Sequence, residues 1–156
     1  MTLRARTLTT FRTDDEASNR FQEHVKEVVN PVLKSLAASL TWIRVGDPGA
    51  PSFGSGWASF GGGFNMVGFA KDALGIVHLR GLASCAAGCA DGTAIFQLPA
   101  GYRPLAIERH VSVGEGGAPA AMYFIDVHPE GGVLIRGTVA AGGFRSLDGI
   151  TFEAVP

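Results

Sequence analysis

The sequence is poor in charged residues and has no long apolar run. Lys, Arg, Asp and Glu make up 17% of the 156 residues, and the formal net charge is −1. A chain this neutral has no surplus of cations for phosphates, so we do not expect it to bind nucleic acid. No segment approaches the roughly 20 apolar residues of a membrane-spanning helix, and the N-terminal residues lack the apolar stretch of a signal peptide. Neither membrane insertion nor a secretion signal is therefore expected.

Residues that bind metals or act in catalysis are also few. The four histidines are isolated from one another in the sequence: His24, His78, His110 and His128. The single pair of cysteines is half of what a structural zinc site usually needs, and it lacks the C-x-x-C redox spacing. No glycine run has the frame of a phosphate-binding loop, and no two carboxylates stand out as an acid and a base. The sequence predicts a protein that is not an enzyme and has no metal or cofactor.

The two cysteines, Cys85 and Cys89, lie in the Gly- and Ala-rich segment 84–91. A local disulfide forms between them if the protein reaches an oxidising medium. Two free thiols on a loop fit the sequence equally well, so both states stay open.

Glycine, in contrast, is abundant, with 22 residues that lie mostly after position 46. Between the glycine-rich turns the apolar residues alternate with polar ones, which is typical of β-strands. We predict a mainly β, antiparallel sandwich or jelly-roll. The predicted strands are 57–60, 64–69, 74–82, 93–98, 105–113, 119–127, 132–139 and 149–154.

Residues 13–45 form a predicted helical stalk, with the helix itself over 13–40. Thr13 and Glu16 fit a capping box at its start. The apolar residues of one seam are spaced by 4, 3 and 4, as in a coiled coil: Phe21, Val25, Val28 and Val32. Two alternatives stay open, because this stripe either packs on the chain's own sheet or pairs with other chains.

Pro31 interrupts this helical pattern. An interior proline removes one hydrogen bond and clashes with the preceding turn. The helix therefore either kinks at Pro31 or ends near Val29, with a second short helix starting at the proline. The break is the favoured alternative.

The remaining segments complete a division into an arm, a stalk, a linker and a head. Residues 1–12 are basic and extended, and they are either a frayed terminus or a docking arm: Arg4, Arg6 and Arg12 carry the charge. Residues 46–56 hold four Gly and two Pro and are predicted to be a linker or a long loop. Residues 57–156 form the β head domain.

Four motifs in the head occur in a fixed order. They are W-A-S-F-G-G-G-F at 57–64, K-D-A-L-G-I-V-H-L-R-G at 71–81, I-F-Q-L-P-A-G-Y-R-P at 95–104, and S-L-D-G-I-T-F-E at 146–153. In this order they resemble the C-terminal head domain of tailed-phage tail fibres and receptor-binding proteins. The cysteine loop departs from that pattern as an insertion, and the short stalk makes a long tail fibre doubtful.

The resemblance implies a structural virion protein on the phage particle surface, made in the host cytoplasm. It implies a homotrimer about a three-fold axis, with the stalk seam between the chains and the basic arm docked on a capsid, tail or baseplate protein. A short tail fibre or spike whose head binds a host cell-surface glycan or protein fits best. The alternatives are a capsid head fibre, a decoration protein or an adaptor for other fibres, and more distantly a polysaccharide depolymerase.

Individual head residues are interpreted in the same frame. Tyr102, Arg103 and Pro104 are expected to lock a turn and a strand start. The aromatic residues Trp57, Phe60 and Phe64 are expected in the core or at a subunit interface. The candidate ligand-contacting loops are 83–92, 114–118 and 129–132.

Overall fold

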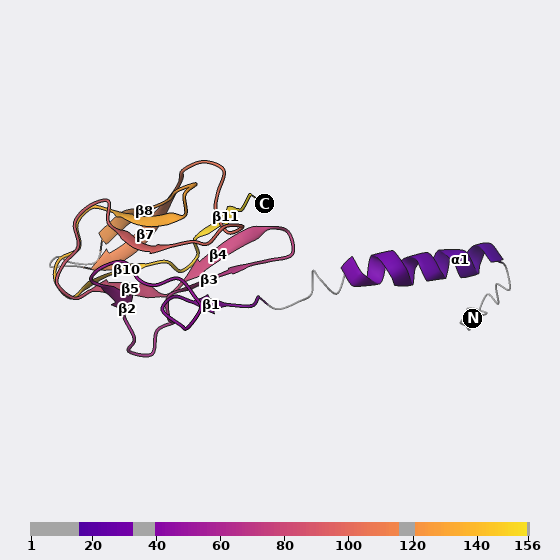
Figure 1. Cartoon of the computed structure of the whole chain (residues 1–156), viewed down its shortest axis with the longest axis horizontal. Coiled ribbons are helices and arrows are strands. Elements are labelled where there is room, and N and C mark those ends of the chain that lie inside the picture. Colours follow the sequence, from indigo (N-terminus) through magenta and orange to yellow (C-terminus); the bar gives the residue numbers. More distant parts are fainter. Residues whose placement is uncertain (1–15, 33–39, 116–120, 156) are drawn as a thin grey trace, which may run out of the picture. The chain divides into compact units, whose positions relative to one another are not determined.

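The computed structural model describes residues 16–32, 40–115 and 121–155. The chain divides into two compact units, residues 1–38 and 39–156. The described helical segment belongs to the first unit, and every described strand belongs to the second (Figure 1).

The helical segment begins with α1 (Glu16–His24) and continues as the π-helical turn η1 (Val25–Val29). Helical geometry extends through Val32, so the favoured break at Pro31 is wrong within the described residues. Pro31 has no N–H to donate, and its ring crowds the carbonyl of the residue four positions earlier. A π-turn directly before it is the local distortion that such a mismatch produces.

The described strands form two antiparallel sheets. The four-stranded sheet has the order β1 (Ile43–Arg44), β3 (Gly68–Lys71), β4 (Ile76–Arg80) and β11 (Thr151–Glu153). The seven-stranded sheet has the order β2 (Trp57–Ser59), β5 (Leu82–Cys85), β10 (Gly143–Ser146), β7 (Glu108–Glu115), β8 (Ala121–Val127), β9 (Gly132–Arg136) and β6 (Ala94–Gln97). The predicted class, a mainly β antiparallel sandwich, is confirmed, and the two sheets nearly close into a barrel (Figure 1).

The core fills the space between the two sheets. The ring of Phe69 on β3 stacks on that of Phe96 on β6, with 6.0 Å between the ring centroids. Within β4, Val77 and Leu79 are buried whereas His78 is half-buried. This alternation follows from the two-residue period of a strand, which turns successive side chains to opposite faces.

Gly81 divides the predicted strand 74–82 into two strands that belong to different sheets. Its φ of +95° lies in the left-handed region that favours glycine. A Cβ at this position would lie 2.5 Å from the carbonyl oxygen of Met66. The prediction of one continuous strand was therefore wrong, because the chain turns at Gly81 from the four-stranded into the seven-stranded sheet.

Two strands were not predicted at all. β10 contains a buried arginine, Arg145, so its sequence lacks the apolar alternation on which strand prediction depends. β1 has only two residues and lies inside the segment 13–45 that was predicted as stalk. The predicted strand 64–69 forms at 68–71 instead.

The segment 46–56 is a long loop of the second unit. Its Gly54 N–H donates to the carbonyl of Ile95 at 2.8 Å, and Phe53 forms a β-bridge with Phe96. Val45, directly before this loop, is buried in the core of the head. The head therefore extends upstream of residue 57.

Candidate functional site

The predicted docking and stalk residues are only partly covered by the described structure. Arg4, Arg6 and Arg12 lie outside the described residues, as do the side chains of Phe21 and Val25. Val28 and Val32 have exposed side chains, at 48% and 54%. Two exposed valines on one helix are available for a further contact.

Cys85 and Cys89 are joined by a disulfide, with 6.0 Å between their Cα atoms. Both residues are buried, and Cys89 forms a β-bridge with Val139. The disulfide thus ties Cys89 to the end of β5, and the β-bridge joins Cys89 to the chain that leads into β10. Of the three candidate contact loops, 83–92 begins within β5, and 129–132 is the turn from β8 to β9. Residues 116–118 of the third loop lie outside the described part of the chain.

The L-P-A-G-Y-R-P motif is held by contacts within the fold. The Nε of Arg103 donates to the carbonyl of Leu98 at 2.9 Å. Tyr102 meets Phe69 edge to face at 5.0 Å, and the Nζ of Lys71 lies 5.2 Å from the centre of the Tyr102 ring. These contacts give Tyr102 and Arg103 the structural role that was expected of them.

The histidines of the head lie apart from one another. The Nε2 of His78, in the middle of β4, is 3.1 Å from Asp72 in the turn before that strand, and the Nδ1 of His128 is 2.9 Å from Glu130 in the turn from β8 to β9. The hydrogen bond from His78 lowers the pKa of Asp72. The Nε2 of His110 is buried without a partner in the described structure, and burial lowers the pKa of His110.

An exposed apolar surface covers the outer face of the β7–β8 hairpin. It consists of two cross-strand pairs, Val111 with Phe124 and Val113 with Met122, and we call these four residues the apolar face. Their exposures range from 46% for Phe124 to 78% for Met122, whereas Ser112 between the valines is 4% exposed. Strand alternation alone would place the valines inside and the serine outside. Sequence reasoning missed this inversion.

Aromatic rings extend the apolar face on the neighbouring strand β10. Phe144 is paired with Glu115 across β10 and β7, and its ring centroid lies 5.2 Å from that of Phe60. Phe60 in turn meets Phe64 edge to face at 5.7 Å. Phe60 and Phe64 are 41% and 54% exposed, whereas Trp57 is in the core at 5%. The three aromatic residues were expected in the core or at a subunit interface. Only Trp57 lies in the core.

A cluster of two arginines and one aspartate borders the apolar face. Arg109 on β7 donates two hydrogen bonds to the carboxylate of Asp126 on β8, at 2.8 and 2.9 Å, and Arg136 on β9 donates a third. The hydrogen bond from Arg109, with that from Arg136, lowers the pKa of Asp126 to about 2, although burial opposes the shift. The cluster therefore carries a net charge of +1 beside the ring of Phe124.

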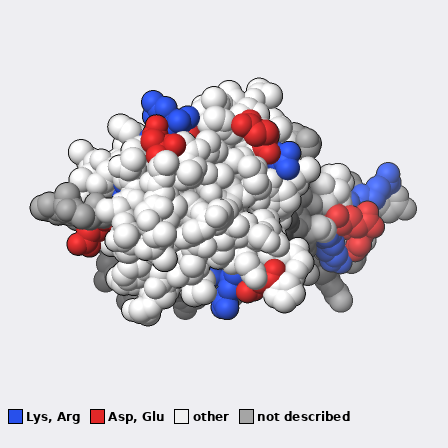
Figure 2. Space-filling model, turned by 60° about the vertical axis from the view of Figure 1, so that its left-hand side comes forward, with Lys and Arg blue, Asp and Glu red and all other residues white. Residues whose placement is uncertain are grey.

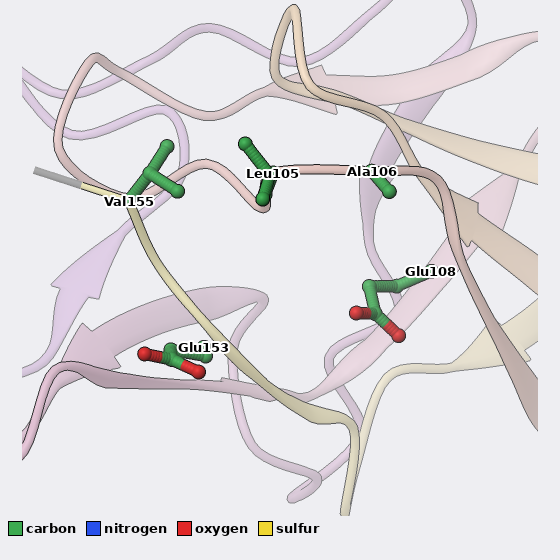
Figure 3. Close-up of a pocket in the computed structure, with 5 residues that line it drawn as sticks. All are labelled: Leu105, Ala106, Glu108, Glu153 and Val155. Atoms are coloured by element: carbon green, nitrogen blue, oxygen red, sulfur yellow. The ribbon is translucent and has the colours of Figure 1, made fainter.

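A pocket of about 340 Å³ lies where the segment before β7 meets the C-terminal strand. Five residues line it: Leu105, Ala106, Glu108, Glu153 and Val155. In Figure 3 the three aliphatic side chains follow one side of the space and the two carboxylates lie along the other. This pocket was not predicted from the sequence, because residues 105–108 and residues 153–155 are far apart in the chain.

Charged residues are few, at 17% of the chain. Figure 2 shows one face of the molecule, on which charged side chains form small clusters around a broad uncharged centre.

Within residues 16–32, 40–115 and 121–155, no three His, Cys, Asp or Glu side chains are grouped so that they could hold a metal ion. No helix in the same ranges is long and apolar enough to cross a membrane. The geometry suits binding through apolar and cationic surfaces.

Comparison with solved structures finds the same fold in two phage proteins. The receptor-binding protein (gp15) of Listeria phage PSA superimposes with a TM-score of 0.63 and 12% sequence identity, over 93% of this chain and 83% of that one. The head domain of the lactococcal phage bIL170, described with receptor-binding domains of lactococcal phages, gives a TM-score of 0.52 and 12% identity, over 75% of this chain and 100% of that one. The resemblance to phage receptor-binding heads is confirmed at the level of the fold. No known protein family and no curated protein matches the sequence.

Proposed function

We propose that this chain is a virion protein of a tailed phage, a short tail fibre or spike whose head attaches the particle to the host surface. The observation that carries the proposal is the fold shared with the phage PSA receptor-binding protein and the phage bIL170 head domain. The role is binding and has no catalytic step. A surface with exposed aromatic rings and a net cationic cluster supports it, because such groups recognise partners without chemistry.

We propose further that the protein acts as a homotrimer. The apolar face supports this, since soluble monomers rarely leave so many large apolar side chains together in water. Contact between copies would cover Val111, Val113 and their partners on β8. In the helical unit, Phe21, Val25, Val28 and Val32 would form the seam between the chains.

The basic residues Arg4, Arg6 and Arg12 are proposed to dock the trimer on a virion protein. Deletion of residues 1–12 is expected to leave the trimer and its binding to cells unchanged but to remove the protein from purified particles, as judged by immunoblot. Normal incorporation of the shortened chain would contradict the docking role.

Adsorption to host cells tests the proposed attachment function. The purified full-length protein, fluorescently labelled, is mixed with cells of the bacterium on which particles carrying the chain grow. We expect saturable binding and protection of those cells from adsorption of the same phage. Adsorption-resistant cells of the same strain are the matched control and should bind no label. Incorporation into particles without any binding to sensitive cells would instead favour a head fibre, decoration protein or adaptor.

A further inference from the structure

The pocket beside β11 combines aliphatic walls with two carboxylates, those of Glu108 and Glu153. Leu105 on its rim is 81% exposed, so a large apolar side chain is left uncovered there. Within the described residues, neither Glu108 nor Glu153 takes part in an ion pair or a side-chain hydrogen bond. The volume of about 340 Å³ lies at the lower end of the range for small-molecule pockets, which corresponds to a single ring.

His110 lies behind this arrangement and does not neutralise it. Its ring centroid is 6.2 Å from that of Phe152, the residue before Glu153 on β11. Burial lowers the pKa of His110, and the nearby carboxylates of Glu108 and Asp126 only partly oppose that shift. The lowered pKa favours the neutral form of the ring, so His110 does not supply a cation to the pocket.

We propose that this pocket binds a protonated primary amine carried on a small ring. Ionised carboxylates only accept hydrogen bonds and an ammonium group only donates them, so the two are complementary in both charge and bonding. The C–H groups of the ring would cover Leu105 and Val155 on the opposite wall (Figure 3). An amino sugar and an aliphatic cyclic amine both have this chemistry. The inference rests on the proposed function for the source of the amine, which would be a host-surface molecule.

Titration of the isotopically labelled full-length protein, followed by amide chemical shifts, tests the proposal. The probes are two amine–alcohol pairs, cyclohexylamine with cyclohexanol and glucosamine with glucose, at mildly acidic pH where the amines are protonated. At least one amine is expected to shift the amides of 105–108 and 153–155 and to bind about tenfold more tightly than its alcohol. Tighter binding of glucosamine would identify a sugar amine, and tighter binding of cyclohexylamine an aliphatic one; either order supports the site.

Substitutions then assign the binding to the two carboxylates. Glu108→Gln and Glu153→Gln are each expected to weaken the amine about tenfold, whereas Glu115→Gln, at the other end of β7, should bind as the unchanged protein does. Unchanged amide spectra outside the pocket verify that the variants are folded. Absence of amine binding, equal binding of amine and alcohol, or full affinity in the Glu108→Gln/Glu153→Gln double variant would overturn the inference.

The outcome can be separated from that of the proposed function. Failure of amine binding, with normal binding to host cells, rejects the pocket and leaves the attachment role intact. Amine binding without any binding to host cells rejects the attachment role and leaves the pocket as a site of other purpose.

Discussion

The backbone N–H of Gly81 donates a 2.8 Å hydrogen bond to the Oδ1 of Asp148, which lies 67 residues further along the chain. The N–H of Leu147 returns a bond of the same length to the carbonyl of Gly81. The turn that carries the chain from one sheet to the other is thereby tied to the L-D-G-I-T-F motif near the C-terminus. The glycine that ends the motif at 71–81 and the aspartate in the motif at 146–153 are thus both needed at the same junction.

Replacement of Gly81 should reveal how much this junction contributes to stability. Gly81→Ala is expected to lower the free energy of unfolding by about 3 kcal/mol, because the added Cβ meets the Met66 carbonyl and the backbone is left-handed. Gly142→Ala is the matched control, with a φ of +76° and nothing within 4 Å of the added Cβ, and should cost about 1 kcal/mol. Urea unfolding measures both, and equal losses would contradict the steric argument.

The buried Arg145 should depend on the aromatic ring of Tyr123. Its guanidinium carbon lies 3.4 Å from the centre of that ring, and its terminal nitrogens donate to the carbonyls of Phe144 and Thr138. Burial lowers the pKa of Arg145, because it disfavours the charged form of the side chain. The cation–π contact with the Tyr123 ring offsets part of this cost. Tyr123→Leu is expected to destabilise the fold by about 2 kcal/mol, and Tyr123→Phe by less than about 1. Thermal unfolding of the two variants checks the difference; a similar loss in both would point to the hydroxyl group instead.

The Asp126 carboxylate should make the fold sensitive to acid. Its pKa is lowered from 3.8 to about 2 in the folded protein. The stabilisation that the ionised carboxylate contributes is therefore complete above the pKa of the unfolded chain, and it is lost as the pH falls through the pKa of the folded protein. We expect a loss of about 2 kcal/mol between about pH 4 and pH 2. Carboxyl chemical shifts followed by NMR give the pKa directly. In Asp126→Asn this part of the acid dependence should disappear, and a titration midpoint near 3.8 in the unchanged protein would contradict the prediction.

Reduction of the disulfide should destabilise the head moderately. The loop closed by Cys85 and Cys89 spans a sequence separation of only 4, so the entropy removed from the unfolded chain corresponds to about 2 kcal/mol. Urea unfolding with and without a reducing agent measures the loss. The Cys85→Ala/Cys89→Ala variant is the control, because the reducing agent should have no further effect on it.

A charge on the apolar face should prevent the proposed self-association. Met122→Asp is expected to convert a trimer into a monomer, because three buried carboxylates would lack partners. Leu74→Asp introduces the same charge on a leucine that is 72% exposed in the turn before β4, against 78% for Met122, and should remain trimeric. Light scattering coupled to size-exclusion chromatography gives the masses, and a monomeric unchanged protein would reject the trimer outright.

The sequence by itself determined the class of the fold and the general placement of most strands. Glycine-rich turns between alternating segments are local features, and the local backbone preferences of glycine and of β-branched residues act without tertiary contacts. The helical segment was predicted for the same reason, since its polar start and its heptad spacing are both local. The order of the four head motifs was enough to indicate the fold that the phage PSA and bIL170 proteins share with this chain.

Only the tertiary structure decided which faces and segments come together. The apolar–polar alternation around Ser112 predicts that Val111 and Val113 face the core, but in the sheet the valines point outwards and the serine is buried. Likewise, Glu108 and Glu153 share a pocket because β7 and β11 meet at one end of the sandwich. Such contacts depend on the order of strands across sheets, which long-range packing selects and no local pattern encodes.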